Sequence, residues 1–278
     1  MPKGARPQLD LGQNFLVDEA SLDAEIGYAD VTARDTVLEV GAGTGNLTGR
    51  LAARAGRVVA IEYDRQFRAK LESIAGATGN VTLVWGDALT VALPPFTKVV
   101  ANLPYRVALP VIMRLLGQPF DRALFIIQKD MAQKISAGPG EAGYGRVSVT
   151  VQRLAQAELL DVVPPSAFSP PPNVDSAMLR LTPVSDPFSV ASAEAFRRLL
   201  DNLFLRRGEK LADALPGLAD VTALLPGRLR AKQVSQLAPG EFGEVSRFLD
   251  SRKVRLPAVR NSAKRTAQAS EGSRRKTR

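Results

Sequence analysis

An α/β fold with a mostly parallel sheet, followed by a small helical domain, is the architecture that this sequence of 278 residues predicts. Between about residues 20 and 130, apolar strand-like runs alternate with stretches of helical periodicity, which is typical of a parallel sheet covered by helices. Four consecutive runs end in a polar residue or a glycine turn. After about residue 187 the periodicity is helical only. Together these observations indicate a ligand-binding edge at the carboxyl ends of the strands.

Five strand-like runs form the parallel part of the expected sheet. Each is short, rich in β-branched and apolar residues, and bounded by turn residues or charges. They span residues 36–40, 57–61, 81–85, 98–101 and 123–128. Helical patterns at 47–55 and 65–74 fill the first two connections.

The remaining elements complete the sheet and define a second domain. Runs near 158–163 and 177–181 have no clear helix between them, so we expect an antiparallel hairpin at one edge and seven strands in all. Residues 183–187 are Pro-containing and suggest a linker. We therefore expect a first domain over 1–185, a helical domain over 186–251 and a basic disordered tail over 252–278. The predicted helices of the second domain span 194–205, 209–215 and 242–250.

Composition excludes several classes of protein. The chain has no Cys and no His, which excludes disulfides, thiolate metal sites, histidine-based triads and zinc hydrolase sites. No apolar run is long enough to span a bilayer. The first six residues lack the apolar core of a signal peptide, so we expect a cytoplasmic protein without membrane contact.

The net charge of +9 is concentrated at the C-terminus. Residues 252–278 hold ten of the 37 basic residues and one of the 28 acidic residues, which leaves 27 of each in the rest of the chain. Such a block is either a solubilising disordered tail or a non-specific tether for nucleic acid, and charge alone does not separate the two.

A glycine-rich turn follows the first strand. Gly41-Ala42-Gly43-Thr44-Gly45 lies between a strand and a helix, where Gly41 and Gly43 let the backbone approach a ligand closely. The dinucleotide fingerprint requires a Gly at position 46, which is Asn in this chain. The G-x-G-x-G form after acidic Glu39 is instead similar to the first motif of class I methyltransferases, which use S-adenosylmethionine. The plain alternative is a tight turn that only joins strand to helix.

Acidic residues at the next two strand ends narrow the choice of cofactor. Glu62 lies about 20 residues past the glycines, where a carboxylate can accept from both hydroxyls of a ribose. Asp87 can accept from an adenine amino group while Ala88 packs on the ring, and it can equally cap a helix that starts at Ala88. The cationic sulfonium of S-adenosylmethionine suits a pocket with Glu39, Glu62 and Asp87, whereas a pyrophosphate does not. The residues therefore favour S-adenosylmethionine over a dinucleotide.

Asn102-Leu103-Pro104-Tyr105 directly follows the fourth strand. The tetrapeptide matches the N/D-[apolar or Pro]-P-Y signature of enzymes that methylate exocyclic amines, although alone it is also a plain turn. The lone pair of such an amine is delocalised into the ring, and two acceptors, the Asn102 side-chain oxygen and the Leu103 carbonyl, would localise it. Pro104 stiffens the turn and Tyr105 offers a stacking face for a flipped base. This chemistry needs orientation and no general base.

Further motifs accompany these in a fixed order, and as a set they resemble the small-subunit ribosomal RNA dimethyladenosine transferase family. The resemblance covers about residues 8–183, and residues 85–87 and 100–105 look closer to archaeal members. The motifs are Gly12-Gln13-Asn14-Phe15-Leu16, the run from Glu39 to Thr48, Gly86-Asp87-Ala88-Leu89, Asn102-Leu103-Pro104-Tyr105, Tyr144-Gly145-Arg146-Val147-Ser148-Val149 and the Pro-rich run from Val163 to Ser176.

The resemblance implies a class I S-adenosylmethionine-dependent methyltransferase with a Rossmann-like, mostly parallel seven-stranded sheet. The second domain is then a small helical RNA-binding domain, and no metal is implied. Phe168 is implied to stack on the target adenine opposite Tyr105, which would cover both faces of a flipped base. The implied cofactor contacts are Asn14, Leu16, Gly41, Glu62, Asp87 and Asn102, to which the residue patterns above add Gly43 and Ala88.

The implied reaction is N6-dimethylation of two adjacent adenosines near the 3′ end of small-subunit ribosomal RNA, in small-subunit maturation. The implied partner is this RNA within an immature small ribosomal subunit, and we expect a monomer. Three alternatives stay open: a non-catalytic ribosome-assembly or transcription factor on the same fold, a large-subunit RNA adenine methyltransferase, and a small-molecule methyltransferase. One departure from the family is residues 204–210, where Gly208 and Glu209 interrupt a basic run. Arg206, Arg207 and Lys210 remain candidates for RNA contact.

Overall fold

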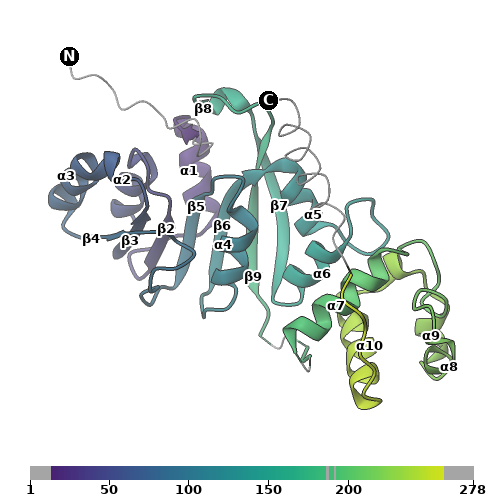
Figure 1. The fold of residues 1–278 in the computed structure, drawn as a ribbon. Helices are drawn as coiled ribbons and strands as arrows, with labels where there is room; N and C mark the ends of the chain where they lie inside the picture. Colours follow the sequence, from purple (N-terminus) through teal and green to yellow (C-terminus); the bar gives the residue numbers. More distant parts are fainter. Residues whose placement is uncertain (1–13, 186–187, 191, 260–278) are drawn as a thin grey trace, which may run out of the picture. The chain divides into compact units, whose positions relative to one another are not determined.

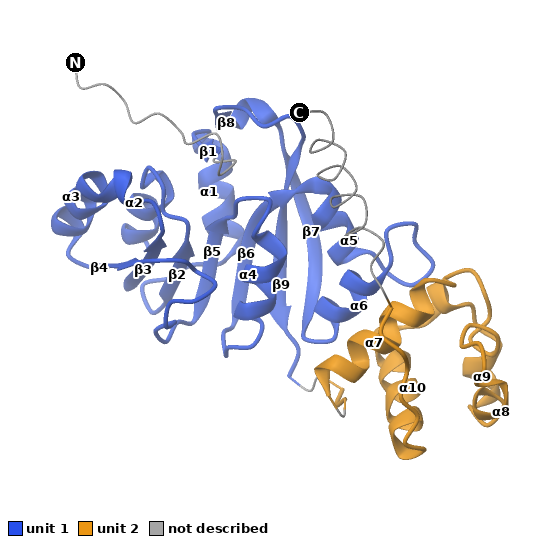
Figure 2. Cartoon of the chain, in the orientation of Figure 1, with its two compact units in different colours: residues 1–187 blue, residues 188–278 orange. Residues whose placement is uncertain are grey.

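The computed structural model describes residues 14–185, 188–190 and 192–259. The chain divides into two compact units, residues 1–187 and 188–278, coloured separately in Figure 2. Each unit is described by itself below. No helix among the described residues is long and apolar enough to cross a membrane.

Unit 1 is built on a seven-stranded sheet in the order β4-β3-β2-β5-β6-β9-β7 (Figure 1). The first five strands of this order are parallel, and β9 runs antiparallel to both β6 and β7. The strands span Val81–Trp85 (β4), Arg57–Glu62 (β3), Thr36–Val40 (β2), Lys98–Asn102 (β5), Arg122–Gln128 (β6), Ser176–Pro183 (β9) and Ala155–Val163 (β7). The predicted mostly parallel α/β sheet with an antiparallel pair at one edge is confirmed.

The strand order reverses between β2 and β5. From β2 the chain proceeds outward through β3 to β4, whereas β5 and β6 lie on its other side. At such a switch point the connections leave in opposite directions, which opens a crevice beyond the carboxyl ends of the two strands. Gly41 follows β2 and Asn102 ends β5, so both lie at this crevice.

Helices cover both faces of the sheet because neighbouring strand residues point to opposite sides. Val37 belongs to a core that includes Leu22, Leu51 and Leu71 of α1, α2 and α3, whereas Leu38 belongs to a core that includes residues of α4, α5 and α6. The helices span Glu19–Tyr28 (α1), Asn46–Ala52 (α2), Arg68–Thr78 (α3), Ala108–Leu115 (α4), Lys129–Ser136 (α5) and Arg146–Gln152 (α6). A 3₁₀ turn, η2 (Arg65–Phe67), precedes α3.

A second, two-stranded sheet joins distant parts of unit 1. Strand β1 (Phe15–Leu16) pairs antiparallel with β8 (Phe168–Ser169), which follows the 3₁₀ turn η3 (Pro165–Ala167). The pairing places Leu16 opposite Phe168. Residues about 150 positions apart in sequence are thereby brought together beside the crevice.

Unit 2 is helical. Its buried side chains include Phe196, Leu200, Phe242 and Leu249, and the rings of Phe204 and Phe242 stack with centroids 5.4 Å apart. The elements are α7 (Ala193–Phe204), α8 (Ala219–Thr222), α9 (Gly227–Arg230), η4 (Val234–Gln236) and α10 (Pro239–Ser251). Helix α7 begins where the Ser192 side chain accepts from the Ala195 N–H at 3.0 Å, a standard N-cap.

The helix expected over 209–215 is wrong. These residues form turns, and Lys210 makes an isolated antiparallel bridge with Gln233. The Leu211 N–H donates to the Lys232 carbonyl at 2.9 Å, so backbone pairing with another segment replaces the helical hydrogen bond. Leu211, Ala214 and Leu215 are buried nonetheless, which explains the helical spacing of apolar residues.

Residues 252–259, which we expected to belong to the tail, contact unit 2. The Arg252 guanidinium lies over the Phe248 ring, 4.1 Å from its centroid, and the Pro257 carbonyl accepts from Asn202 Nδ2 at 3.0 Å. The rest of the expected tail, residues 260–278, lies outside the described residues.

Candidate functional site

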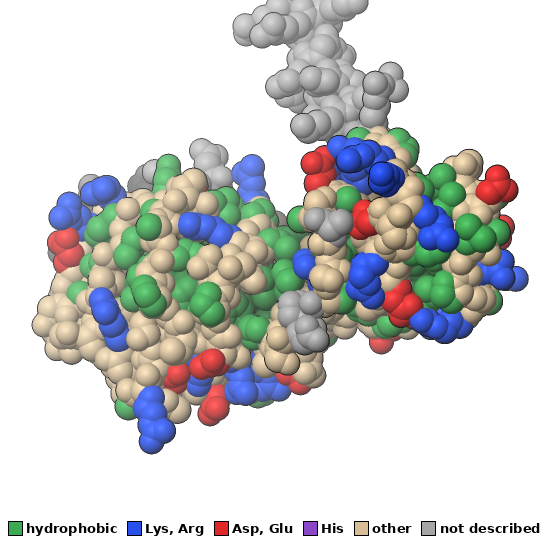
Figure 3. All heavy atoms as spheres, turned by 90° about the horizontal axis from the view of Figure 1, so that it is seen from below, with side chains coloured by type: hydrophobic (Ala, Val, Ile, Leu, Met, Phe, Trp, Pro, Cys, Tyr) green, Lys and Arg blue, Asp and Glu red, His purple; other side chains and the backbone are tan. Residues whose placement is uncertain are grey.

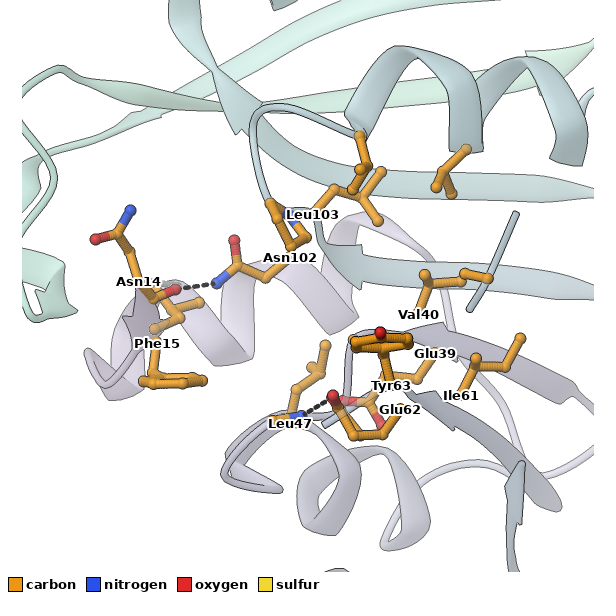
Figure 4. A pocket seen from close by; sticks show the side chains of 18 of the residues that line it. Asn14, Phe15, Glu39, Val40, Leu47, Ile61, Glu62, Tyr63, Asn102 and Leu103 are labelled. Carbon is orange, nitrogen blue, oxygen red and sulfur yellow. Dashed lines mark hydrogen bonds between the residues drawn. The ribbon is translucent and has the colours of Figure 1, made fainter. Parts of the chain in front are cut away.

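A cavity of about 570 Å³ lies at the switch point, beyond the carboxyl ends of β2, β3 and β5. Figure 4 shows lining side chains from these strands, from β1 and from the start of α2. The residues that the sequence indicated for the cofactor and for catalysis all line this cavity: Asn14, Leu16, Gly41, Gly43, Glu62, Asp87, Ala88, Asn102, Leu103, Pro104, Tyr105 and Phe168.

The glycine turn needs its glycines for two reasons. Gly41, Gly43 and Gly45 all have positive φ, at 80°, 52° and 77°. Side chains other than Gly rarely adopt this conformation without strain. A Cβ at Gly43 would also lie 2.9 Å from the Phe15 ring. The turn therefore brings its backbone to the cavity with no side chain in between.

Glu62 is oriented by the same turn. Its Oε2 accepts from the Gly43 N–H at 2.8 Å and its Oε1 accepts from the Asp64 N–H at 2.7 Å. Burial raises the pKa of Glu62, and the backbone hydrogen bonds oppose that rise. A carboxylate has about four acceptor positions, so these two hydrogen bonds leave acceptor capacity for a ligand. A carboxylate held in this way suits the hydroxyls of a ribose.

Asp87 lies in a turn that does not continue as a helix. Its Oδ1 accepts from the Leu89 N–H at 2.8 Å, and its Oδ2 has no hydrogen-bond donor among the described residues. The guanidinium of Arg114, from α4, donates to the carbonyls of Ala88 and Val91 and fixes the turn. The side chain of Asp87 is exposed, so Oδ2 is accessible to an amino group at this end of the cavity.

The Asn102 amide contacts Asn14, the residue directly before β1. Its Nδ2 donates to the Asn14 carbonyl in a long contact of 3.5 Å, drawn as a dashed line in Figure 4. With the nitrogen directed at Asn14, the side-chain oxygen of Asn102 is the atom left to accept a hydrogen bond. This is the orientation that an amine-binding role requires.

Leu103 contributes its backbone. Its N–H donates to the Ile126 carbonyl of β6 at 3.1 Å, which continues the β5–β6 ladder past the end of the strand. The Leu103 side chain is buried in the core, at 1% exposure. No backbone N–H in the described part of the chain donates to the Leu103 carbonyl oxygen. Pro104 follows, and its carbonyl accepts from Val107 at 3.0 Å to close the turn.

Tyr105 is held by Ser176. The two hydroxyl oxygens are 2.7 Å apart, and Ser176 is fully buried at the start of β9. Burial raises the pKa of Tyr105, and the bond to Ser176 partly counteracts the rise. Sequence reasoning assigned Tyr105 a stacking face but did not find the residue that fixes it.

The β1–β8 pair forms one wall of the cavity. Leu16 and Phe168 are each 4% exposed, and Asn46 of α2 donates from Nδ2 to the Leu16 carbonyl at 3.1 Å. Phe168 packs in the core beside α1 and also lines the cavity. This wall depends on the pairing of β1 with β8, which are far apart in sequence, and no local motif predicts that pairing.

Three further lining residues were not found from the sequence. Phe15 packs its ring edge-on against Phe67, with centroids 5.4 Å apart, and Tyr63 is an aromatic side chain 67% exposed. Glu25, on α1, also lines the cavity and is 0% exposed. A signal for Glu25 existed in the sequence: it lies between Leu22 and Ile26 on the apolar face of a helix, where a charged residue is unusual.

Acidic side chains dominate the electrostatics of the cavity. Burial raises the pKa of Glu39 to about 8, opposed by the hydrogen bond from Thr48 at 2.7 Å and aided by the nearby Glu62. Burial, together with the charge of Glu39, raises the pKa of Glu25 well above its usual range. Arg106, the one basic residue among the lining residues, is exposed. The cavity therefore suits a ligand with positive charge.

In the described part of unit 2, several basic side chains are paired with acidic ones. Arg206 pairs with Glu209 at 3.0 Å, and Arg228 and Lys232 pair with acidic residues of α10. On the face shown in Figure 3, Lys and Arg side chains are interspersed with Asp and Glu.

Four features define a methyltransferase of class I. They are a Rossmann-like sheet with an antiparallel edge, a glycine turn after the first parallel strand, acidic residues at the ends of the next two strands, and Asn-Leu-Pro-Tyr at the end of the fourth. The comparisons with known proteins agree. The family described as ribosomal RNA adenine dimethylase matches residues 5–248. The chain belongs to this family and is an rRNA adenine dimethyltransferase.

Relatives from archaea carry matching descriptions. A probable ribosomal RNA small subunit methyltransferase A from Halobacterium salinarum is 40% identical over 227 residues, which are 80% of this chain and 79% of the relative. One with the same description from Methanococcoides burtonii is 35% identical over 246 residues, 85% of this chain and 91% of the relative.

Two solved structures are similar in fold. A dimethyladenosine transferase from Plasmodium falciparum superimposes with a TM-score of 0.78 at 25% identity, over 87% of this chain and 100% of that chain. The 23S rRNA methyltransferase ErmE gives a TM-score of 0.67 at 26% identity, over 85% of this chain and 100% of that chain.

Proposed function

We propose that this enzyme transfers methyl groups from S-adenosylmethionine to the exocyclic amines of two adjacent adenosines near the 3′ end of small-subunit ribosomal RNA. The substrate would be an immature small ribosomal subunit in the cytoplasm, with the enzyme acting as a monomer. The observation that carries the proposal is the pair of free acceptors at the end of β5, the Asn102 side-chain oxygen and the Leu103 carbonyl.

The polar groups that line the cavity fit S-adenosylmethionine. Glu62 keeps acceptor capacity for a ribose, and Asp87 has an Oδ2 without a donor among the described residues, which suits an adenine amino group beside Ala88. The buried Glu39 offers a carboxyl group whose ionisation a cationic ligand would favour. Gly41, Gly43, Asn14 and Leu16 would supply backbone and wall contacts. When bound, the cofactor supplies an electrophilic methyl group on a sulfonium.

The two acceptors would prepare the amine for attack. Adenine N6 carries two N–H bonds, and the Asn102 oxygen and the Leu103 carbonyl can each accept one of them. Hydrogen bonds in this geometry draw the nitrogen towards a tetrahedral arrangement and localise its lone pair on the methyl side. Such bonds strengthen as positive charge develops on the nitrogen, so they lower the barrier more than they stabilise the bound substrate.

Tyr105 and Phe168 are proposed as the walls of the adenine slot. A base must leave its stack to reach the cavity, and covering its faces with aromatic rings offsets the lost stacking. The bond between Tyr105 and Ser176 keeps the Tyr105 ring in one orientation. The product proton leaves to water after transfer, so no residue is required to act as a base.

Locating the label on RNA tests this proposal directly. Small ribosomal subunits that lack the modification are incubated with the enzyme and radioactive S-adenosylmethionine, and the labelled nucleotides are mapped. We expect label in two adjacent adenosines near the 3′ end of the small-subunit RNA, and up to four methyl groups per subunit.

Label only in large-subunit RNA would contradict the proposal and favour the reaction named for ErmE. RNA binding with no transfer of label would favour a non-catalytic assembly or transcription factor. Label in a small molecule with none in RNA would indicate the third alternative.

A further inference from the structure

Glu25 is a buried carboxylic acid on α1. It is 0% exposed, and neither Oε1 nor Oε2 has a hydrogen-bond donor within residues 14–185, 188–190 and 192–259. An ionisable group left unsatisfied in the interior costs free energy, so its presence calls for a compensating role. Helix α1 would pack as well with an apolar residue between Leu22 and Ile26.

The position of Glu25 links it to the cavity. Glu25 and Glu39 both line the cavity, from α1 and β2 respectively. The charge of Glu39 acts on Glu25, so the two carboxyl groups are neighbours. Glu39 is tied to Thr48 of α2, whereas Glu25 has no such bond. The pair therefore has unused acceptor capacity that belongs to Glu25.

Two neighbouring carboxyl groups in a dry site do not both ionise unless a cation joins them. For Glu39 the pKa of about 8 indicates a protonated group at neutral pH in the empty cavity, and the pKa of Glu25 is likewise raised. A cation placed beside the pair reverses this balance, because attraction between opposite charges is strong where water is excluded. The pair is thus neutral when the cavity is empty and can become negative when a cation binds.

We propose that Glu25, together with Glu39, forms a carboxyl pair that recognises the α-ammonium group of the cofactor's amino-acid end, and that a proton leaves the pair to solvent when the cofactor binds. The inference rests on the proposed use of S-adenosylmethionine. No covalent bond changes: one carboxyl O–H loses its proton to water, and the resulting carboxylate faces the ammonium.

The position of Glu25 and Glu39 within the cavity favours the ammonium over the sulfonium, which is the other cationic group of the cofactor. Glu62 and Asp87 lie at the ends of β3 and β4 and are proposed to hold the ribose and adenine. Asn102 and Leu103 mark the place where the methyl group must be delivered. The amino-acid end would then be left for the part of the cavity that Glu25 and Glu39 line.

The binding experiment uses two ligands that differ in this end. S-adenosylhomocysteine keeps the amino-acid end, and 5′-methylthioadenosine lacks it. Their affinities for the full chain are measured by calorimetry with the wild type, Glu25→Gln and Glu25→Leu. Glu19→Gln is the matched control, because Glu19 lies on the same helix with its side chain 85% exposed and paired with Arg50.

We expect Glu25→Gln and Glu25→Leu to weaken S-adenosylhomocysteine about tenfold, which is about 1.4 kcal/mol. Binding of 5′-methylthioadenosine should stay within about twofold, and Glu19→Gln should change neither. Repeating the titration at pH 7 in buffers of different ionisation enthalpy measures the proton count. The wild type should release a fraction of a proton with S-adenosylhomocysteine, and Glu25→Gln should release less.

Melting temperatures of the free proteins provide an independent readout. Glu25→Leu should melt higher than the wild type because it removes an unsatisfied buried carboxyl. The role of Glu25 would be overturned if the wild type and Glu25→Gln showed the same ratio of S-adenosylhomocysteine affinity to 5′-methylthioadenosine affinity and released the same number of protons. A wild type that binds neither ligand would overturn the proposed cofactor instead, and the inference with it.

Discussion

At the scale of residues, the chemistry of the site depends on which atoms the fold has already engaged. The nitrogen of the Asn102 amide is directed at Asn14 and its oxygen is left free, while the Leu103 side chain is anchored and its carbonyl is left free. The motif could be recognised from the sequence. Which of its atoms are engaged and which remain free could not, because this depends on where Asn14 lies.

Asn102→Ala removes one of the two acceptors for the amine. We expect kcat to fall by about 10²–10³, the range seen when one preorganised hydrogen bond to a transition state is lost. Cofactor affinity, measured by calorimetry, should change by less than about fivefold. The control is Asn46→Ala, which removes a similar Asn-to-carbonyl bond, to Leu16, but leaves both acceptors in place. A similar loss of kcat in both variants would mean that Asn102 only supports the segment from Asn14 to Leu16.

The bond between Tyr105 and Ser176 supports a double-mutant test. Tyr105→Phe keeps the stacking ring and removes its hydroxyl, and Ser176→Ala removes the partner. Each should raise KM for RNA about three- to tenfold, because the ring loses its fixed orientation. The double variant should be little worse than either single one, with a coupling of about 1 kcal/mol. Additive effects would show that the two hydroxyls act independently.

Local motifs predicted the residues of the site that follow a strand directly. Glu62, Asp87 and Asn102 could be predicted because the carboxyl ends of parallel strands share one edge. Ser176 and Glu25 could not, because their roles depend on contacts with residues far away in sequence. Phe168 entered only through a family resemblance, and its place opposite Leu16 depends on the β1–β8 pairing.

At the scale of elements, strands were predicted better than short helices. The bounds of β2 and β4 agree with the sequence pattern, and those of β3 and β5 differ by one residue, since continuous apolar runs fix a buried strand. The segment 209–215 shows the converse. Its apolar spacing is helical, but the Leu211 N–H pairs with the Lys232 carbonyl and is not available for a helical hydrogen bond.

The layer formed by α1, β2 and α2 should lose stability as pH rises from 5 to 8. In the folded chain Glu39 keeps its proton up to a pKa of about 8, whereas in the unfolded chain it loses the proton near its ordinary value of 4.5. The folded state therefore holds more protons across this interval, and each such group lowers the free energy of unfolding by up to about 1.4 kcal/mol per pH unit. Glu25 acts in the same direction, and Glu62 to a lesser extent.

Between pH 5 and 8, few other groups contribute to the pH dependence of stability. The chain has no His, and the pKa values of Asp35 and Glu158 are lowered, so their stabilising contributions are already complete at pH 5. Urea unfolding at pH 5, 6.5 and 8 measures the slope for the wild type, Glu39→Gln and the exposed control Glu72→Gln. Glu39→Gln should flatten the slope because it removes the titrating carboxyl group. The Gln side chain can still accept the hydrogen bond from Thr48, so the fold should be retained. A wild-type stability that rises over this interval would refute the assignment.

At the scale of the whole molecule, charge is divided unevenly along the chain. Residues 1–251 hold equal numbers of basic and acidic side chains, and the excess follows α10. Because 252–259 contact unit 2 through Asn202 and Phe248, a truncation at 252 would remove packing as well as charge. A cut after Val259 separates the two effects.

Deleting residues 260–278 removes seven basic residues and one acidic residue while keeping the Pro257–Asn202 bond. If these residues contact RNA phosphates, each contact adds about 0.7 to the slope of log affinity against log salt for a single strand. We expect the truncated chain to bind RNA more weakly at low salt and with a slope smaller by about 2–4, while its melting temperature is unchanged. A full-length variant with the same seven residues changed to Gln should reproduce the smaller slope. An unchanged slope in both variants would mean that the tail only adds solubility, and RNA affinity would then depend on the two folded units.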